Sequence, residues 1–311
     1  MTHRTRRSQA GAALLTAMVI VTLVATMAAA MVWQQWRAVQ VEAAERARMQ
    51  AAWILTGAID WARLILREDA RNGGADSLDE PWATPLAETP LSTFLAADKD
   101  NTDDAPEAFL SGVITDAQAR YNLRNVFDEQ AGKLVPVEVA ALTRLCEAAG
   151  VSGDVAERLA NGVAAATLGT EDAPLLPRTV AQLGWLGLDA DTVHMLAPYL
   201  VLLPTRTPVN LNTASKEVIA AATGMTPADA AQLVQARQQA PFRTLQDAKK
   251  YLPATFVLNP RQAGVASNYF EVRGQLRLGD RVLQERSLVQ RRSPEVVTIQ
   301  RERINLNDPG G

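Results

Sequence analysis

A charge-free apolar run near the N-terminus constrains this chain more than any other feature. No charged residue stands between Arg7 and Arg37, so 29 consecutive residues, 8–36, carry no formal charge. A helix of about 20 apolar residues crosses the hydrocarbon core of a bilayer. A secretory signal has a shorter apolar core of about 7–15 residues, and its small-residue cleavage site follows that core. Here the small-residue boundary Ala10-Gly11 precedes the run, which predicts a membrane helix that stays on the mature chain.

The helical pattern continues after the charge-free run. No proline occurs from Trp33 to Arg67, and apolar or small residues recur close to every 3.6 positions opposite a charged face. We predict one helix over 12–67, membrane-spanning over 12–36 and amphipathic afterwards. Asn72-Gly73-Gly74 then stops it.

Charge and cysteine content limit the classes of function. The net charge of −3 includes Arg4, Arg6 and Arg7, so the chain without these three carries about −6, and nothing in this charge suggests a generic polyanion binder. Arginines before the span predict a cytoplasmic N-terminus, and in a bacterium a periplasmic remainder. Cys146 is the only cysteine, so an internal disulfide is impossible, and we interpret it as a buried apolar side chain.

Residues 73–109 contain four prolines and are predicted to be rich in loops. Within them Asp98, Asp100, Asp103 and Asp104 offer hard oxygen ligands of the kind that calcium prefers. The stretch lacks the glycine and the distal glutamate of an EF-hand loop. We therefore predict a solvated loop and no cofactor, with calcium at these four aspartates as the alternative.

The middle of the chain reads as helical. Residues 110–125 predict a short strand pair around an Asp turn that leads into a helix. Between Pro136 and Pro253 the sequence predicts a series of helices. The candidate ranges are 136–149, 153–166, 178–185, 189–202, 214–223, 227–238 and 244–251.

An internal echo suggests two small helical units. Tyr121-Asn122-Leu123-Arg124-Asn125 and Val209-Asn210-Leu211-Asn212-Thr213 each place an Asn-Leu-x-Asn element or a close variant ahead of helices. Asn side chains bond to nearby backbone groups, which suits entry into a helix. We predict helical units over 125–203 and 204–262.

The second unit resembles a helix-hairpin-helix module, which in other proteins often binds DNA through backbone N–H groups of a glycine-rich hairpin. Here the hairpin keeps only Gly224, and Pro227 supplies no N–H donor. The two helices offer Lys216 and Arg237 as their only cations, which is little charge for neutralising phosphates. We predict a structural or protein-binding unit and no nucleic acid; a membrane-anchored DNA-uptake protein using this unit is the alternative.

The C-terminal region has the alternating polarity of β-strands. Polar and apolar side chains alternate over 268–278, and Gly279-Asp280 is typical of a hairpin turn. Residues 281–291 are predicted to form the return strand. A turn at Ser293-Pro294-Glu295 leads to a third strand over 296–304.

Chemistry-bearing residues are scarce, which disfavours an anchored periplasmic enzyme as a third reading. His3 and His194 are the only histidines, and there is no phosphate-loop, HExxH or GxSxG motif. We interpret His194 as a packed helix residue and predict no catalytic, cofactor-binding or metal residues.

Four short sequence elements follow one another along the chain. They are Gly11 with Ala12-Ala13-Leu14-Leu15-Thr16, Thr115-Asp116-Ala117-Gln118 with Tyr121-Asn122-Leu123, Asn210-Leu211-Asn212-Thr213-Ala214, and Ser267-Asn268-Tyr269-Phe270. In this order, together with the order of a long helix, strands, a helical insert and a C-terminal meander, they resemble the minor pseudopilin K family of type II secretion over nearly the whole chain. The leader also resembles those of type IV pilins.

The resemblance implies an assembly role. A prepilin peptidase would cut after Gly11 and leave Ala12 as the N-terminus, the residue that pilins methylate. Most pilins carry a glutamate where this chain has Thr16, held to pair with the terminal amine of a neighbouring subunit. A subunit with nothing stacked above it has no such amine to pair, so Thr16 indicates the filament tip.

The implied partners are the minor pseudopilins I and J, the major pseudopilin G, the inner-membrane assembly platform and the peptidase. The implied location is the bacterial inner membrane, crossed once, with the ectodomain in the periplasm. The resemblance implies a non-enzymatic tip subunit that initiates or caps the pseudopilus for protein export across the outer membrane.

The fold class that we predict is α+β. A pilin-like fold packs the long N-terminal helix on a small antiparallel sheet and carries a large all-α insertion of the SAM-like or helix-hairpin-helix kind. The predicted domains are a leader over 1–11, the helix over 12–67, the first part of the core over 68–124, helical units over 125–203 and 204–262, and completing strands over 263–305.

Overall fold

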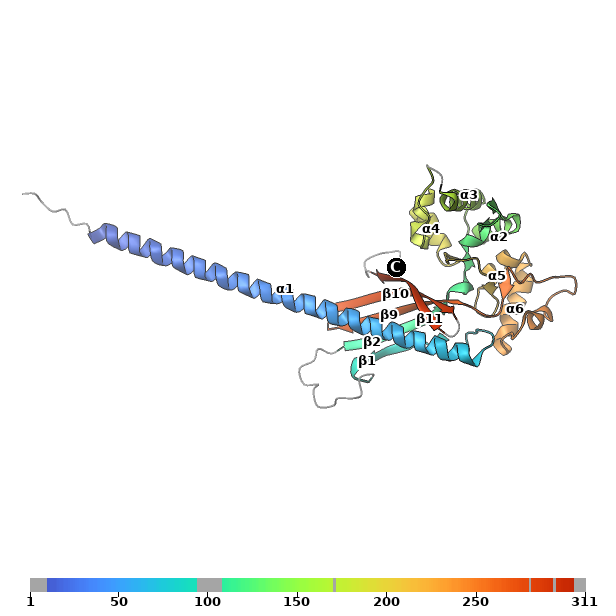
Figure 1. Cartoon of the computed structure of the whole chain (residues 1–311), viewed down its shortest axis with the longest axis horizontal. Helices are drawn as coiled ribbons and strands as arrows, with labels where there is room; N and C mark the ends of the chain where they lie inside the picture. The colour runs from blue at the N-terminus through green and yellow to red at the C-terminus, as the bar shows by residue number, and fades with distance from the viewer. Residues whose placement is uncertain (1–9, 94–107, 170–171, 280, 293–294, 305–311) are drawn as a thin grey trace, which may run out of the picture. The chain divides into compact units, whose positions relative to one another are not determined.

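The computed structural model describes residues 10–93, 108–169, 172–279, 281–292 and 295–304. The chain forms two compact units, Met1–Ile54 and Leu55–Gly311, and helix α1 (Ala10–Asn72) contributes to both (Figure 1). The helix is five residues longer at its C-terminal end than the predicted 12–67. It ends at the predicted stop, where Gly73 adopts a left-handed φ of +64°.

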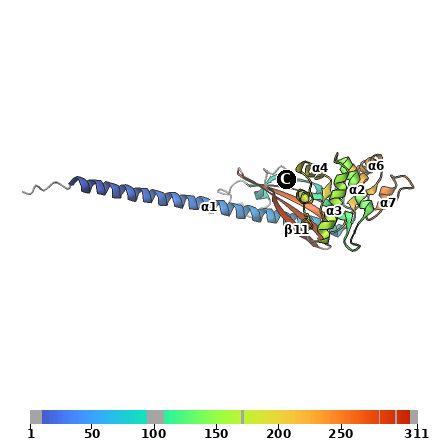
Figure 2. The same ribbon diagram turned by 90° about the horizontal axis from the view of Figure 1, so that it is seen from above.

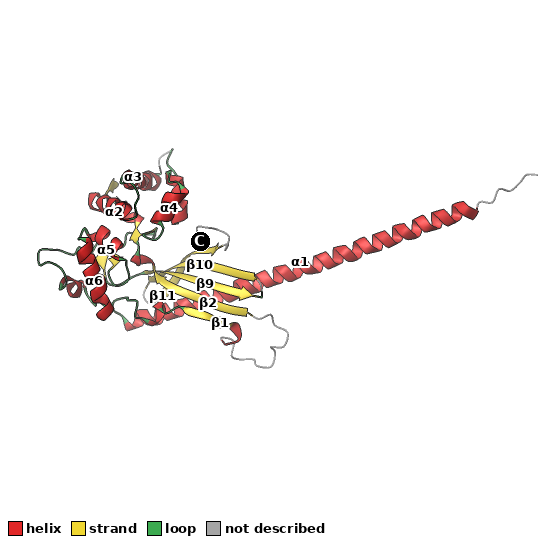
Figure 3. Cartoon of the chain, turned by 180° about the vertical axis from the view of Figure 1, so that it is seen from behind, coloured by secondary structure: helices red, strands yellow, loops and turns green. Residues whose placement is uncertain are grey.

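One antiparallel sheet forms the framework of the second unit. Its order is β1-β2-β9-β10-β11, and Figure 3 shows the five strands side by side. The bounds are β1 (Leu86–Pro90), β2 (Ala108–Asp116), β9 (Tyr269–Leu278), β10 (Arg281–Arg292) and β11 (Glu295–Ile304). The predicted C-terminal meander is confirmed as β9–β10–β11, and these three strands complete a sheet that β1 and β2 begin.

The last turns of α1 bury one face against this sheet. Ile59, Ala62 and Leu66 recur at helical spacing and pack with a buried apolar cluster of the sheet and of the 3₁₀ helix η1 (Pro81–Ala83). That cluster consists of Trp82, Ile114, Phe270, Val272, Val289 and Val296. Each large side chain that is fully buried contributes about 1.5–3 kcal/mol.

Two strands do flank the Asp turn predicted over 110–125, but they do not pair with each other. β2 pairs with β9, and the two-residue strand β3 (Tyr121–Asn122) pairs in parallel with β6 (Leu200–Val201) of the insert. The carboxylate of Asp116 accepts a hydrogen bond from the backbone N–H of Gln118, and this turns the chain into the 3₁₀ helix η3 (Ala117–Ala119). The partner missing from the prediction is β1, an irregular edge strand that ends in Pro90.

The helical insert lies between η3 and β9, and its helices gather at one end of the sheet (Figures 1 and 2). Its helices are η4 (Leu123–Val126), α2 (Pro136–Ala148), α3 (Asp154–Leu168), η5 (Val180–Leu186), α4 (Ala190–Leu196), α5 (Lys216–Thr223), α6 (Pro227–Gln239) and α7 (Leu245–Lys249). Four two-residue strands lie among these helices, namely β3 (Tyr121–Asn122), β6 (Leu200–Val201), β7 (Val209–Asn210) and β8 (Ala263–Gly264). A small hairpin of β4 (Phe127–Asp128) and β5 (Lys133–Leu134) precedes α2, and a further 3₁₀ turn, η2 (Leu91–Thr93), follows β1.

Two predicted helices differ from the structure. Residues 180–186 form a 3₁₀ helix, η5, instead of an α-helix over 178–185. The helix predicted over 189–202 ends at Leu196, because Pro198 follows and the chain enters β6. Leu200 of β6 then pairs in parallel with Tyr121 of β3.

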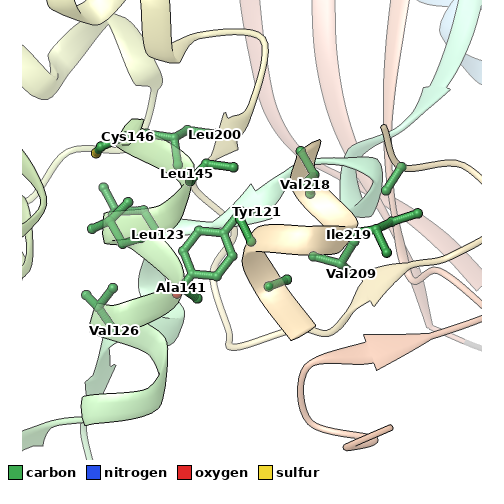
Figure 4. Close-up of a cluster of buried hydrophobic side chains, with 14 of the residues drawn as sticks. Tyr121, Leu123, Val126, Ala141, Leu145, Cys146, Leu200, Val209, Val218 and Ile219 are labelled. Carbon is green, nitrogen blue, oxygen red and sulfur yellow. The ribbon is translucent and has the colours of Figure 1, made fainter. Parts of the chain in front are cut away.

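One buried apolar cluster runs through both predicted helical units. Leu142 and Leu145 of α2 belong to it together with Val218 and Ile219 of α5, and Figure 4 shows Tyr121 between the two groups. The insert therefore has a common core.

Candidate functional site

In the first unit, the stretch of α1 up to Trp36 carries no charge and has apolar side chains on every side. Its large apolar residues between Leu14 and Val41 are 53–66% exposed in this chain. A helix of this composition that is apolar all round belongs in a membrane or against other helices. The helix is long and apolar enough to cross a bilayer.

Thr16, Gly11 and Ala12 all lie at the start of α1. The hydroxyl of Thr16 donates to the carbonyl oxygens of Ala12 (3.1 Å) and Ala13 (2.9 Å). The hydroxyl is thus satisfied within its own helix, so position 16 presents neither a charge nor an unsatisfied donor to a neighbour. Residues 1–9 of the leader lie outside the described residues.

In the second unit Asp116, the last residue of β2, is the hub of a buried hydrogen-bond network. Its carboxylate accepts from Asn210 Nδ2 (2.9 Å), Thr213 Oγ1 (2.6 Å), Ser267 Oγ (2.7 Å) and the backbone N of Gln118 (2.7 Å). Burial raises the pKa of Asp116, and the hydrogen bonds from Thr213 and Ser267 oppose that rise. One carboxyl group therefore ties the helical insert to the sheet.

Asp76, just after α1, joins the same network. Its carboxylate accepts from the backbone N of Ser267 (2.6 Å) and from Arg291 Nη1 (2.8 Å), and its carbonyl oxygen accepts from Asn210 Nδ2 (3.1 Å). Burial raises the pKa of Asp76, and the Arg291 guanidinium opposes that rise. We call Asp76, Asp116, Asn210, Ser267 and Arg291 the polar joint.

The polar joint brings together three of the four sequence elements that carried the resemblance. Asp116, Asn210 and Ser267 each belong to a different one of them, and 151 positions separate Asp116 from Ser267. Their shared role is to fix the insert on the sheet. Gln118 strengthens the tie, because its side chain accepts from Asn268 N (2.7 Å) and donates to Pro208 O (3.1 Å).

The repeated Asn elements at 121–125 and 209–213 form the same local hydrogen bond. Asn122 Oδ1 accepts from Arg124 N (3.1 Å), and Asn210 Oδ1 accepts from Asn212 N (2.9 Å). These are the local backbone bonds that the sequence predicted. Asn122 also accepts from Leu203 N (3.1 Å), a tie across the insert that local reasoning does not predict.

A second pair of Asn residues closes larger loops. Asn125 exchanges two hydrogen bonds with the backbone of Thr207 (2.8 and 3.0 Å). Asn212 does the same with the backbone of Phe242 (2.9 and 2.9 Å). In both places the buried side-chain amide satisfies the N–H and the C=O of one backbone residue that has no strand neighbour to pair with.

Three carboxylates, of Asp69, Asp76 and Glu80, lie within 4.8 Å of one another, close enough to hold a metal ion. Arg291 already pairs with two of them, Asp69 at 2.6 Å and Asp76 at 2.8 Å. Glu80 accepts from Ser77 N and from Trp82 Nε1 (2.8 Å each). A second cation here would face the Arg291 charge, so the group does not fit a metal site. The four aspartates named for calcium lie outside the described residues.

One of the two cations in the helices of the helix-hairpin-helix-like unit is bonded within the chain. Arg237 donates to the backbone oxygens of Leu211 and Ala214 (2.6 Å each), and burial lowers its pKa. Lys216 stands 3.8 Å from Glu217. The arginine therefore supports the chain ahead of α5, and the geometry favours the structural reading.

An open cleft of about 1300 Å³ separates η5 and α4 from the sheet. Ion pairs cover its sheet side: Arg120–Glu271 at 2.8 Å, Arg273–Glu271 at 2.7 Å and Arg286–Glu302 at 2.8 Å. Burial alone would raise the pKa of Glu271, but Arg120 and Arg273 hold it below its usual value. Charges of both signs are balanced here, which indicates a structural face.

The structure corrects the interpretation of His194 and supports that of Cys146. His194 is exposed on α4 and lines the helical side of this cleft, so it is not a packed helix residue. Cys146 is buried in α2, and burial raises the pKa of its thiol to about 11. A thiol of that pKa stays protonated and unreactive near neutral pH.

A smaller apolar pocket of about 270 Å³ lies between the end of α1 and the sheet. Its walls include Trp61 and Trp82, and its floor includes Gly112 and Gly274. Most of its lining is apolar, and Arg273 is the charged residue that borders it.

Comparison with known proteins places these features in one family. The family description "Type II secretion system (T2SS), protein K" matches residues 209–268, the stretch from β7 to the loop before β9. Three curated relatives are all called type II secretion system protein K. The one from Pseudomonas aeruginosa is 29% identical and covers 89% of this chain and 87% of the relative. The one from Pectobacterium carotovorum is 27% identical and covers 96% and 97%, and the one from Klebsiella pneumoniae is 30% identical and covers 76% and 75%.

A solved structure shares the fold. It is the crystal structure of the GspK-GspI-GspJ complex from the type 2 secretion system of enterotoxigenic Escherichia coli. One chain of it matches with a TM-score of 0.63 and 20% identity, over 84% of this chain and 98% of that chain. The predicted α+β, pilin-like fold is confirmed by this match and by the sheet described above.

Proposed function

This chain belongs to the type II secretion system protein K family and is a minor pseudopilin of type II secretion. On that premise we propose that it caps the tip of the pseudopilus and initiates its assembly for protein export across the outer membrane. The observation that carries the proposal is Thr16, whose hydroxyl is satisfied inside α1.

The reason is electrostatic. A pilin glutamate at this place needs a cationic partner, because an unpaired charge in the hydrocarbon of a bilayer costs about 2.5–3.5 kcal/mol. Thr16 has no such requirement, since its Oγ1 donates to two carbonyl oxygens of its own helix. A subunit with no amine stacked above it can therefore insert without cost, which is the situation at a filament tip.

The helical insert supports the same position. It occupies the chain between β2 and β9, two strands that are direct neighbours in the sheet, and it has a core of its own. So large an addition to a small pilin-like sheet needs space that a tip leaves open and a packed shaft does not.

The partners follow from this position. The matched structure is a complex with GspI and GspJ, which supports the minor pseudopilins I and J as direct neighbours. The major pseudopilin G and the inner-membrane assembly platform would meet the chain below the tip. The exposed apolar side chains of α1 between Leu14 and Val41 would pack first in the membrane and then against the helices of these subunits.

Processing precedes assembly in this proposal. Arg4, Arg6 and Arg7 would hold the N-terminus in the cytoplasm, and the ectodomain would lie in the periplasm. Prepilin peptidase would then cut between Gly11 and Ala12, and the new amine of Ala12 would be methylated. The proposed role needs no catalysis by the chain itself, and its family is a structural one.

Mass spectrometry of the mature N-terminus tests the proposal. The expected N-terminal residue is Ala12, and changing Gly11→Ile is expected to block both cleavage and secretion. Thr16→Val keeps the size of the side chain and is the matched control, since it should be cut and should secrete normally. Normal cutting and secretion of Gly11→Ile would contradict the processing step.

A further inference from the structure

The charge-free run of α1 changes its chemistry at Trp33. Before this residue, the side chains from Ala12 onward are apolar apart from threonines, and the threonine hydroxyls, such as that of Thr22, donate to carbonyl oxygens of their own helix. From Gln34 onward amides appear, and Arg37 is the first charged residue. Amides and charges lose their hydrogen bonds to water inside hydrocarbon, so the hydrocarbon of a bilayer ends near this place on the helix.

The length of the apolar part agrees with that boundary. Residues 12–32 make about 31 Å of helix at 1.5 Å per residue, and the hydrocarbon of a bilayer is about 30 Å thick. Hydrocarbon that reached Trp36 would also contain the amide of Gln34. The predicted membrane span therefore divides into an apolar part that matches the hydrocarbon and a short aromatic end beyond it.

Trp33 and Trp36 form a pair of rings at this aromatic end. Their ring centroids lie 5.5 Å apart, and the two side chains are 63% and 57% exposed. A tryptophan has an apolar ring and one N–H donor, which suits the border between hydrocarbon and lipid headgroups. Arg37, one position further along, offers a guanidinium of the kind that binds phosphate. The three side chains together fit the headgroup layer of a lipid bilayer.

We propose that Trp33 and Trp36 lie among the lipid headgroups on the periplasmic side of the membrane and set the depth of α1. Their N–H groups would donate to lipid oxygens, and Arg37 would pair with a lipid phosphate. Residues 12–32 would then fill the hydrocarbon. The side of the membrane rests on the proposed function, whereas the depth follows from the helix itself.

Depth-dependent fluorescence quenching tests the placement. The full chain is reconstituted in nanodiscs of phosphatidylcholine and phosphatidylglycerol that carry bromine atoms either near the glycerol end or near the methyl end of the acyl chains. Bromines near the glycerol end should quench the tryptophan emission more strongly. Replacing both rings, by Trp33→Phe and Trp36→Phe, should remove most of that quenching.

Trp53→Phe is the matched control. Trp53 lies on the same helix, about 25 Å beyond Trp36, and is 76% exposed, so its loss should leave the quenching by lipid unchanged. Stronger quenching of Trp33 and Trp36 from the methyl end would put the rings inside the hydrocarbon and overturn the placement. Quenching from neither position would put them away from lipid and overturn it as well.

Cysteine labelling tests whether the two rings set the depth. Cys146 is buried and its thiol has a pKa of about 11, so it does not compete for a maleimide at neutral pH. In the same nanodiscs a water-soluble maleimide should label Gln40→Cys and spare Met31→Cys. Met31 lies about 200° around the helix from Trp33, so its labelling reports depth and not shielding by the rings.

Adding Trp33→Ala and Trp36→Ala to the Met31→Cys chain should abolish its protection from the maleimide, and adding Trp53→Ala should not. Protection that survives the loss of both rings would show that they do not set the depth. The nanodiscs contain neither a peptidase nor another subunit, so these failures would leave the proposed function standing. An ectodomain found in the cytoplasm of cells would instead count against the proposed function.

Discussion

The two units of this chain differ in which side chains they bury and which they expose. From Leu55 onward, many buried polar groups are paired with others of the same unit, and Asp116 accepts four hydrogen bonds. In the first unit the polar hydroxyls of Thr16, Thr22 and Thr26 bond back to their own helix, and the apolar side chains remain exposed. One unit pairs its polar groups across distant parts of the chain, and the other presents an apolar surface that suits a membrane or the helices of other subunits.

A charge placed on the two units should therefore have very different effects, and this is the largest expected difference. Val24→Arg puts a cation in the middle of the apolar run and should cost about 2.5–3.5 kcal/mol of membrane insertion. Secretion is expected to be lost. Leu175→Arg is the control, because Leu175 is exposed by 71% in the insert, more than the 59% of Val24.

Secretion assays and fractionation of membranes measure both variants. Leu175→Arg should insert and secrete as the wild-type chain does. Equal behaviour of the two variants would mean that the exposed apolar helix has no special role, and the contrast between the units would collapse.

Substitutions in the polar joint should lower the free energy of unfolding more than substitutions elsewhere in the second unit. Asp116→Ala leaves the donors of Asn210, Thr213 and Ser267 without their acceptor and is expected to lower the free energy of unfolding by about 3–5 kcal/mol. Asp60→Ala, on the exposed side of α1, should change it by no more than about 0.5 kcal/mol. Urea unfolding measures both, and a mild effect at Asp116 would show that the joint is not what holds the insert.

A smaller effect concerns pH. Burial raises the pKa of Asp116 above its model-peptide value of 3.8, so between that value and the raised pKa the folded state binds more protons than the unfolded state. Stability from this group is complete below pH 3.8 and is lost as pH rises through the folded pKa. Asp116→Asn should remove that slope.

Glu271 supplies a control of opposite sign. Its pKa is lowered, so the stability that it contributes is present above 4.5 and is lost as pH falls through the folded pKa. Urea midpoints at several pH values between 3 and 7 should show Glu271→Gln changing the acid end of the profile and Asp116→Asn the stretch above it. A slope in Asp116→Asn that equals the wild-type slope would contradict the assignment.

The sequence predicts those features that depend on nearby residues. The run over 8–36 and the helical spacing behind it predict α1, and the alternation over 268–304 predicts β9, β10 and β11. The local bonds of Asn122 and Asn210 follow from the chemistry of asparagine. These predictions work because helix, strand and turn patterns have short periods.

Features that join distant residues escape such reasoning. The three side-chain partners of Asp116 lie 94 to 151 positions away, and nothing in local periodicity selects them. Strand β1 escapes because its short, proline-ended sequence resembles a loop until β2 pairs with it. The apolar pocket likewise depends on the register that sets Gly112 opposite Gly274. The motifs that carried the family resemblance are the best guide to the polar joint, since three of them meet there.

The position of the chain in the filament tests the central claim most directly. Antibodies against the helical insert, coupled to gold, can be applied to pseudopili assembled with an excess of the major pseudopilin and viewed by electron microscopy. The account predicts label at one end of each filament. Label repeated along the shaft would contradict it.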